Sequence, residues 1–182
     1  PPMIEKRTTS TRDTMTDQVP QTRIYRTWNI PSVDSEVTDR MNLVSQVLGG
    51  SQSSRLDKRL VFQDKLADSV STFAWGSELG GLFIVQVDVK QGIDPAKVEA
   101  ALNEELNKLI ATGPTEAELA QAKTVIEAGF VRGIERIGGF GGKADVLAEC
   151  AVFTGDPACY AKTLSVIEQS SVKDVQATAE KW

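Results

Sequence analysis

The chain has 182 residues, a net charge of -5 and a pI of about 4.9, with 41% apolar and 25% charged residues. This composition indicates a globular protein of one domain or one compact pair of subdomains, and its acidity argues against nucleic-acid binding, which needs basic patches. There are two cysteines and no histidine, and no apolar run is long enough to predict a membrane span.

The N-terminal part of the chain is polar. Residues 1–20 predict a linker or an edge strand. The chain opens with Pro1-Pro2 and no initiating methionine, so we expect it to be a fragment of a larger protein. Residues Arg23–Ile30 alternate between apolar and polar, which predicts a half-buried strand whose apolar face is interrupted by Arg26.

The next element is a helix with Asp34 as the expected N-cap. Its apolar residues recur every three or four positions, and they are Val37, Met41, Val44 and Leu48. Gly49-Gly50 predicts its end, and Ser54 can cap a short helix after it. Two strands then follow, Ala67–Trp75 and Leu82–Val89, and the short glycine-rich connection between them predicts an antiparallel hairpin.

The rest of the chain is helical. Asp94-Pro95 marks a helix start, Gly113-Pro114 ends that helix, and Thr115–Glu118 forms a capping box for the next one. The further predicted segments are an interruption at Gly138–Gly142, a helix over Lys143–Thr154, a helix from Asp156-Pro157, and a last helix from Ser171 to Trp182. The order predicts an α+β fold, with a small, mostly antiparallel sheet of three or four strands, helices packed on one face, and a helical C-terminal half.

Cys150 and Cys159 lie nine positions apart, on either side of a predicted turn. Two separate buried thiols fit this spacing, and so does a disulfide that joins two helix ends in an oxidising compartment. Spacing alone does not decide between them, because a disulfide depends on geometry.

Two glycine-containing segments resemble anion-binding loops. Gly138–Lys143 lacks the Ser or Thr that a phosphate-binding loop places after its lysine, so we interpret it as a hinge between helices. The segment Gly49–Arg55 could bind an anion at a helix N-terminus. We instead expect a structural loop, formed by Gly49, Gly50, Ser53, Ser54 and Arg55, in which Arg55 pairs locally.

No set of residues predicts catalysis. A serine nucleophile needs a base, which is usually histidine, and the one Ser-x-x-Lys, from Ser170 to Lys173, lacks the partner motifs of that chemistry. Glu104-Glu105 is expected on the solvent side of a helix, and Glu116 and Glu118 at a helix start. Two thiols without histidine do not make a zinc site, so we expect no catalytic, metal or cofactor-binding residue in the chain.

Seven blocks occur in a fixed order from Tyr25 to the C-terminus. They are Tyr25–Trp28, Val47–Leu56, Arg59–Val61, Leu66–Ser71, Gly113–Leu119, Gly138–Asp145 and Gly155–Pro157. Together they resemble the insulinase/pitrilysin family of zinc peptidases, which includes the mitochondrial processing peptidases and bacterial relatives. The family's inverted zinc motif, His-x-x-Glu-His, has no counterpart here.

The resemblance implies that residues 21–182 form the non-catalytic C-terminal domain of a larger protein. The Arg and Tyr with which the family's substrate-anchoring half holds substrate align with Val61 and Asp68, so the chain is similar to the second domain of the catalytic half. We therefore expect an exposed apolar patch where another domain would pack, with candidates on the first strand, where Tyr25 and Trp28 point to opposite faces.

The resemblance also implies what the longer protein does. It would be a bacterial zinc endopeptidase, periplasmic or in the cell envelope, with zinc in its missing catalytic domain and two halves that enclose peptides. The partners of this chain would be the other domains and, through them, peptide substrates. The alternative is a domain of an inactive peptidase homologue that acts as an assembly or binding subunit, and a His-x-x-Glu-His motif upstream would distinguish the two.

Overall fold

The computed structural model describes residues 7–182, and the expectation for residues 1–20 falls partly on residues 1–6, which lie outside the described residues. Residues 7–22 contain neither helix nor strand. One antiparallel sheet follows, in the order β1-β3-β2, and its strands are β1 (Arg23–Ile30), β2 (Ala67–Gly76) and β3 (Gly81–Val89). The predicted hairpin between the last two strands is confirmed.

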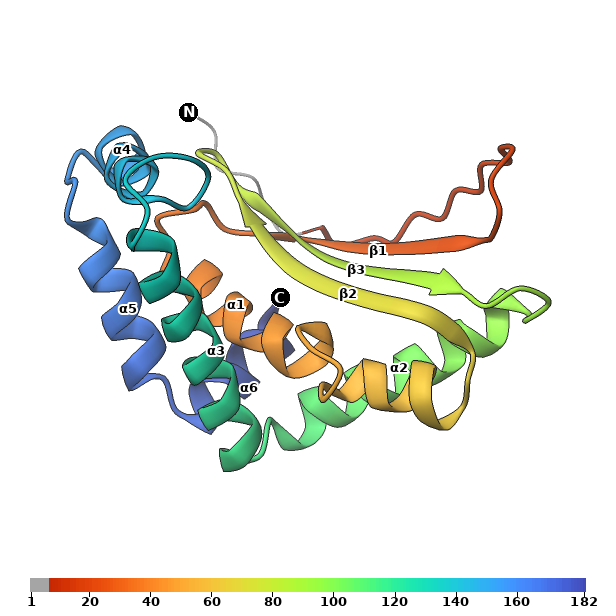
Figure 1. Ribbon diagram of the computed structural model, residues 1–182. Helices are drawn as coiled ribbons and strands as arrows, with labels where there is room; N and C mark the ends of the chain where they lie inside the picture. The colour runs from red at the N-terminus through yellow and green to blue at the C-terminus, as the bar shows by residue number, and fades with distance from the viewer. Residues whose placement is uncertain (1–6) are drawn as a thin grey trace.

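The helices lie on one side of this sheet, most of them below it in Figure 1, and within residues 7–182 no helix lies over the opposite face. They are α1 (Glu36–Gly49), the π-helix η1 (Asp57–Gln63), α2 (Pro95–Thr112), α3 (Glu116–Ile134), α4 (Lys143–Thr154), α5 (Cys159–Gln169) and α6 (Val172–Lys181). The α+β class, the antiparallel sheet and the one-sided helical layer are therefore confirmed.

The core lies between the sheet and helices α1 and α2. The central strand β3 contributes every second side chain to it, namely Phe83, Val85, Val87 and Val89. The facing helices contribute Val44, Leu48, Val98 and Leu102 among others. Full burial of each such side chain is worth about 1.5–3 kcal/mol, which fixes the register of β3 and hence the side chains that its other face presents.

Arg26 lies on the inner face of β1, as the alternation predicts, and the structure accommodates its charge. The guanidinium donates a hydrogen bond to the side-chain oxygen of Asn103 on α2 and lies 5.4 Å from the centre of the Trp28 ring. Trp28 in turn packs on Phe83, with 5.9 Å between the ring centres. A charged side chain is tolerated here because its guanidinium is hydrogen-bonded and lies over an aromatic ring.

Most helix starts follow the predicted caps. Asp94 accepts a hydrogen bond from the backbone N–H of Ala96, and Thr115 with Glu118 forms a full capping box at the start of α3. Ser171 and Asp174 form a second box at α6. Each box satisfies backbone N–H groups that have no partner in the first turn of a helix.

Several local predictions are wrong. The N-cap of α1 is Ser35 rather than Asp34, and its hydroxyl accepts from the N–H of Val37. Ser54 does not cap the following helix through its side chain, since its hydroxyl donates to the Ser51 carbonyl, 2.6 Å away. Helix α5 starts at Cys159, later than the predicted Asp156-Pro157.

Glu105 is also not on a solvent face. It is buried, with 8% of its surface exposed, and its carboxylate lies 2.7 Å from the ammonium of Lys108 and 3.9 Å from the guanidinium of Arg59. Its neighbour Glu104 remains at the surface, 3.1 Å from the same guanidinium. The helical turn that places Glu104 outward places Glu105 against η1, which the sequence does not show.

Candidate functional site

The outer face of the sheet, turned away from the helices, carries exposed aromatic and aliphatic side chains at one end. Strand pairing places Thr27, Ile84 and Phe73 in one row and Asn29, Leu82 and Trp75 in the next. Trp75 is 63% exposed and Tyr25, one row further along β1, is 58% exposed. We call Tyr25, Phe73, Trp75 and Leu82 the outer apolar face.

Of the two candidates on β1 that were expected to point to opposite faces, Tyr25 is the exposed one and Trp28 is turned inward. The sequence reasoning missed Phe73, Trp75 and Leu82, which make up most of the face. The sequence does contain a signal for two of them. Because side chains alternate along a strand, Phe73 and Trp75 lie on one face of β2, while Val70 and Ala74 lie on the other. Both faces of β2 are therefore apolar, as in a strand covered on two sides.

The opposite end of the same face is polar. Arg23 donates to one carboxylate oxygen of Asp88, and the hydroxyl of Ser69 donates to the other at 2.7 Å. Desolvation raises the pKa of Asp88, but these two hydrogen bonds and the charge of Arg23 outweigh it, so the pKa is lowered overall. The sheet thus presents a graded surface, with an ionised cluster at one end and the outer apolar face at the other.

The loop Gly49–Arg55 joins α1 to η1 and anchors α3. The guanidinium of Arg55 donates to both carboxylate oxygens of Glu118, at 2.8 and 2.7 Å, and to the carbonyl of Gly113 at 3.0 Å. Hydrogen bonds from Arg55 lower the pKa of Glu118 to about 2 against an opposing effect of desolvation, with help from the backbone of Thr115. The local pairing expected for Arg55 is therefore wrong, since its partner is 63 residues away.

The remaining loop residues are held closely. A Cβ on Gly49 would lie 2.8 Å from the Cγ2 of Thr72, so glycine allows α1 to approach β2. Gln121 donates to the hydroxyl of Ser53 at 2.7 Å. The cavity beside the loop measures about 20 Å³, which is room for about one water. With Arg55 engaged by a carboxylate, this loop offers no free cation to an anionic ligand.

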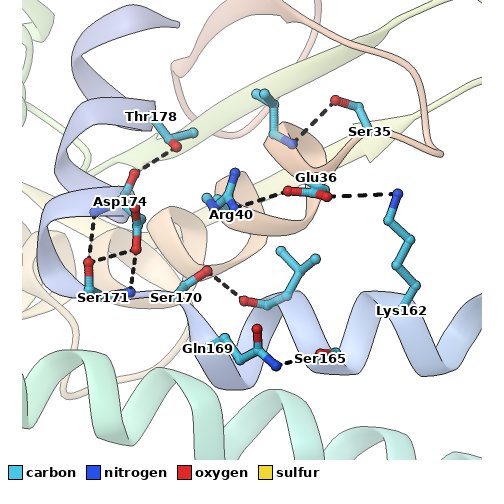
Figure 2. Close-up of polar contacts among 12 residues, drawn as sticks. Ser35, Glu36, Arg40, Lys162, Ser165, Gln169, Ser170, Ser171, Asp174 and Thr178 are labelled. Atoms are coloured by element: carbon cyan, nitrogen blue, oxygen red, sulfur yellow. Dashed lines mark hydrogen bonds and ion pairs between the residues drawn. The ribbon is translucent and has the colours of Figure 1, made fainter.

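A larger groove of about 390 Å³ lies between α1, α5 and the start of α6 (Figure 2). Glu36 links its two cations, with 3.1 Å to the guanidinium of Arg40 and 3.8 Å to the ammonium of Lys162. Asp174 belongs to the capping box with Ser171. Positive and negative charges balance in this groove, so it exerts no net attraction on an ionic ligand.

Beside the groove, Asp39 is buried on α1. Burial raises the pKa of its carboxyl to about 6, although a hydrogen bond from Thr163 and the charge of Lys162 act in the opposite direction. No active-site pattern surrounds Asp39, so we interpret it as a structural carboxyl whose burial disfavours its ionised form.

The structure places the other candidates apart from any reactive group. Ser170 donates to the carbonyl of Val166 at 2.6 Å, which leaves no Ser–Lys pair with Lys173. The segment Gly138–Gly142 connects α3 to α4, and all of it except Gly142 is exposed. Within residues 7–182, no cluster of three or more His, Cys, Asp or Glu side chains could hold a metal ion, and no helix is long and apolar enough to cross a membrane.

Of the two alternatives for the cysteines, the disulfide is the one present, and separate thiols are wrong. Cys150 in the second half of α4 is bonded to Cys159 at the start of α5.

The sequence pattern described as "Peptidase M16 inactive domain" matches residues 1–126, more than half of the chain. The chain belongs to the peptidase M16 inactive-domain family. This confirms the resemblance to insulinase/pitrilysin peptidases and identifies the chain as a non-catalytic domain of an M16 protease. A search of the curated proteins finds no match.

Solved structures share the fold of this M16 inactive domain. A protease from Helicobacter pylori has a TM-score of 0.80 at 20% identity, over 91% of this chain and 39% of that one. A candidate zinc protease from Bordetella pertussis has a TM-score of 0.75 at 22% identity, over 87% and 86%. The inactive peptidase domain of a candidate zinc protease from Bordetella parapertussis has a TM-score of 0.74 at 21% identity, over 92% of this chain and 90% of that one. The chain thus spans about two fifths of the Helicobacter protease.

Proposed function

We propose that this M16 inactive domain is a wall of a peptide-enclosing chamber in a bacterial zinc metalloendopeptidase, where it contacts the other domains and the enclosed peptide. The outer apolar face carries this proposal. This face exposes four large apolar side chains to water, namely Tyr25, Phe73, Trp75 and Leu82. Such exposed patches mark sites where another protein surface packs, and aromatic residues are enriched at protein interfaces.

Zinc and the catalytic base belong, in this proposal, to a separate catalytic domain that carries the His-x-x-Glu-His motif. This chain would act by position, and peptide hydrolysis would depend on it without using any of its side chains in a chemical step. The larger size of the Helicobacter protease, of which this chain spans 39%, supports a parent with further domains.

A periplasmic or cell-envelope location is part of the same proposal. The Cys150–Cys159 disulfide supports it, because disulfides persist in oxidising compartments such as the bacterial periplasm and are rare in the cytosol.

The test is binding of the catalytic domain of the same protease, supplied as a separate chain, to wild type and to Trp75→Ser/Leu82→Ser. The double variant removes apolar area from an exposed face and leaves the inner core residues in place. We expect its Kd, measured by calorimetry, to rise at least about tenfold. Phe62→Ser is the matched control, because Phe62 is 53% exposed but lies on η1.

Equal affinity of the double variant and wild type contradicts the proposal. The alternative, an inactive homologue that serves as an assembly subunit, predicts the same loss of binding. The two proposals differ in what they predict for the complete protein, since an inactive homologue would hold no zinc and cleave no peptide.

A further inference from the structure

Helix α4 contributes almost nothing to the core of the domain. Cys150 is its one buried side chain, while Leu147, Val152 and Phe153 are exposed. Phe140, in the loop before it, is 96% exposed. Figure 1 shows α4 at one end of the molecule, beyond the ends of α3 and α5. A helix that carries apolar residues all round is expected to be buried, so packing does not explain why α4 stays where it is.

The hydrogen bonds around α4 are local. The N–H groups of Lys143 and Ala144 donate to the carbonyls of Arg136 and Ile137, and the hydroxyl of Thr154 accepts from Asp156 N–H. Among residues 7–182, no recorded hydrogen bond or ion pair joins α4 to the sheet, to α1 or to α2.

Helix α5, in contrast, is firmly held. Its Ile167 is 1% exposed, and the ammonium of Lys123 on α3 donates to the carbonyl of Glu168 at 2.6 Å. The rings of Phe130 and Tyr160 stack with their centres 5.7 Å apart, which holds the start of α5 against α3. The Cys150–Cys159 disulfide therefore joins a poorly packed helix to an anchored one.

Glycines flank α4 on both sides. Gly139 and Gly141 have φ of +85° and +69°, and Gly155 at the C-cap has φ of +76°, a left-handed conformation that glycine adopts without strain. These positions let the chain change direction at either end of α4.

We propose that the Cys150–Cys159 disulfide is a redox latch that holds α4 against α5, and that its reduction by a dithiol releases residues 136–158 as a flap while the rest of the domain stays folded. Cys159 is half-buried whereas Cys150 is buried, so the sulfur of Cys159 accepts the attack of one thiolate of the dithiol. The S–S bond breaks with its electron pair on the sulfur of Cys150, which takes up a proton. The second thiol of the dithiol then displaces Cys159 as a thiol. The net change is one disulfide and one dithiol converted to two cysteine thiols and one cyclic disulfide.

The latch gives the exposed apolar side chains of α4 two states. In the oxidised domain Val152 and Phe153 are presented at fixed positions next to α5, and in the reduced domain they move with the flap. A partner domain that packs on α4 would thus meet a defined surface only in an oxidising compartment.

Hydrogen exchange read by mass spectrometry tests the latch on the whole chain. Wild type is compared before and after treatment with excess dithiothreitol, and with Cys150→Ser/Cys159→Ser. We expect the amides of residues 143–154 to exchange at least about tenfold faster in the reduced chain and in the double variant, and those of β3 and α1 to be unchanged. Dithiothreitol should have no further effect on the double variant.

Unchanged exchange in α4 after reduction would show that packing holds it, and the latch would be refuted. Equal acceleration in β3 would refute it as well, because the disulfide would then stabilise the whole fold. A bridge that excess dithiothreitol does not reduce in the folded chain is the third refuting outcome, and thiol counting with Ellman's reagent detects it.

Discussion

Arg55→Ala removes the ion pair that joins the loop after α1 to the start of α3. The Glu118 carboxylate has a pKa of about 2 in the folded chain against an ordinary value of 4.5. At about 1.4 kcal/mol per unit this corresponds to about 3 kcal/mol at neutral pH. Hydrogen bonds from Thr115 supply part of this shift and remain in the variant, and the Glu118 side chain is 29% exposed, so the share that Arg55 contributes is about 2 kcal/mol. The hydrogen bond to Gly113 adds about 1 kcal/mol that does not depend on pH.

The pH dependence separates the two contributions. A carboxyl whose pKa is depressed in the folded state stabilises that state above the unfolded pKa and loses this effect as the pH falls through the folded pKa. The difference in unfolding free energy between wild type and Arg55→Ala should therefore be about 3 kcal/mol at pH 7 and shrink toward about 1 kcal/mol between pH 4.5 and pH 2.

Urea denaturation followed by circular dichroism at pH 7, 5 and 3 measures this difference. Arg12→Ala is the matched control, because Arg12 also forms a two-pronged pair, with Glu99, but is 74% exposed. We expect no measurable change in that variant. A difference for Arg55→Ala that is the same at pH 7 and pH 3 would refute the assignment of the stability to the ion pair.

Three further outcomes are expected. Asp39→Asn should raise the unfolding free energy at pH 7 by up to about 3 kcal/mol, because a carboxyl with a raised pKa of about 6 disfavours the folded state once the pH exceeds its ordinary 3.8. This gain should vanish near pH 4, with Asp68→Asn as the exposed control, and a loss of stability at pH 7 would contradict it. Thr115→Ala should cost about 1 kcal/mol in urea denaturation through the lost cap, whereas Lys143→Ala should cost little, and stabilisation of wild type by a nucleotide would show that the glycine loop was misinterpreted. After chelation and dialysis the chain should retain no stoichiometric zinc by elemental analysis, and zinc that is lost on Cys150→Ser would overturn this.

Interactions between neighbours in sequence could be predicted. The capping boxes at Thr115 and Ser171 act over three residues, and the hairpin at Gly76–Gly81 closes over six, so their side chains and turns are specified locally. The inward side chains of β3 follow from simple alternation. Sequence blocks in a fixed order also sufficed to assign the family.

Contacts between distant residues could not be predicted. Arg55 pairs with Glu118, and the buried Glu105 lies beside Arg59. The spacing of residues along the sequence indicates neither of these pairs. The state of the two cysteines could not be predicted, because a disulfide depends on how α4 and α5 lie relative to each other. The alternation of β2 shows that Phe73 and Trp75 share one face, but only the absence of a helix over that side of the sheet in the described chain makes this face a surface. The sequence by itself determined the elements and their family, because these depend on short-range hydrogen bonds and periodicity. The tertiary structure alone decided which groups are buried, paired or exposed, because burial depends on the packing of the whole chain.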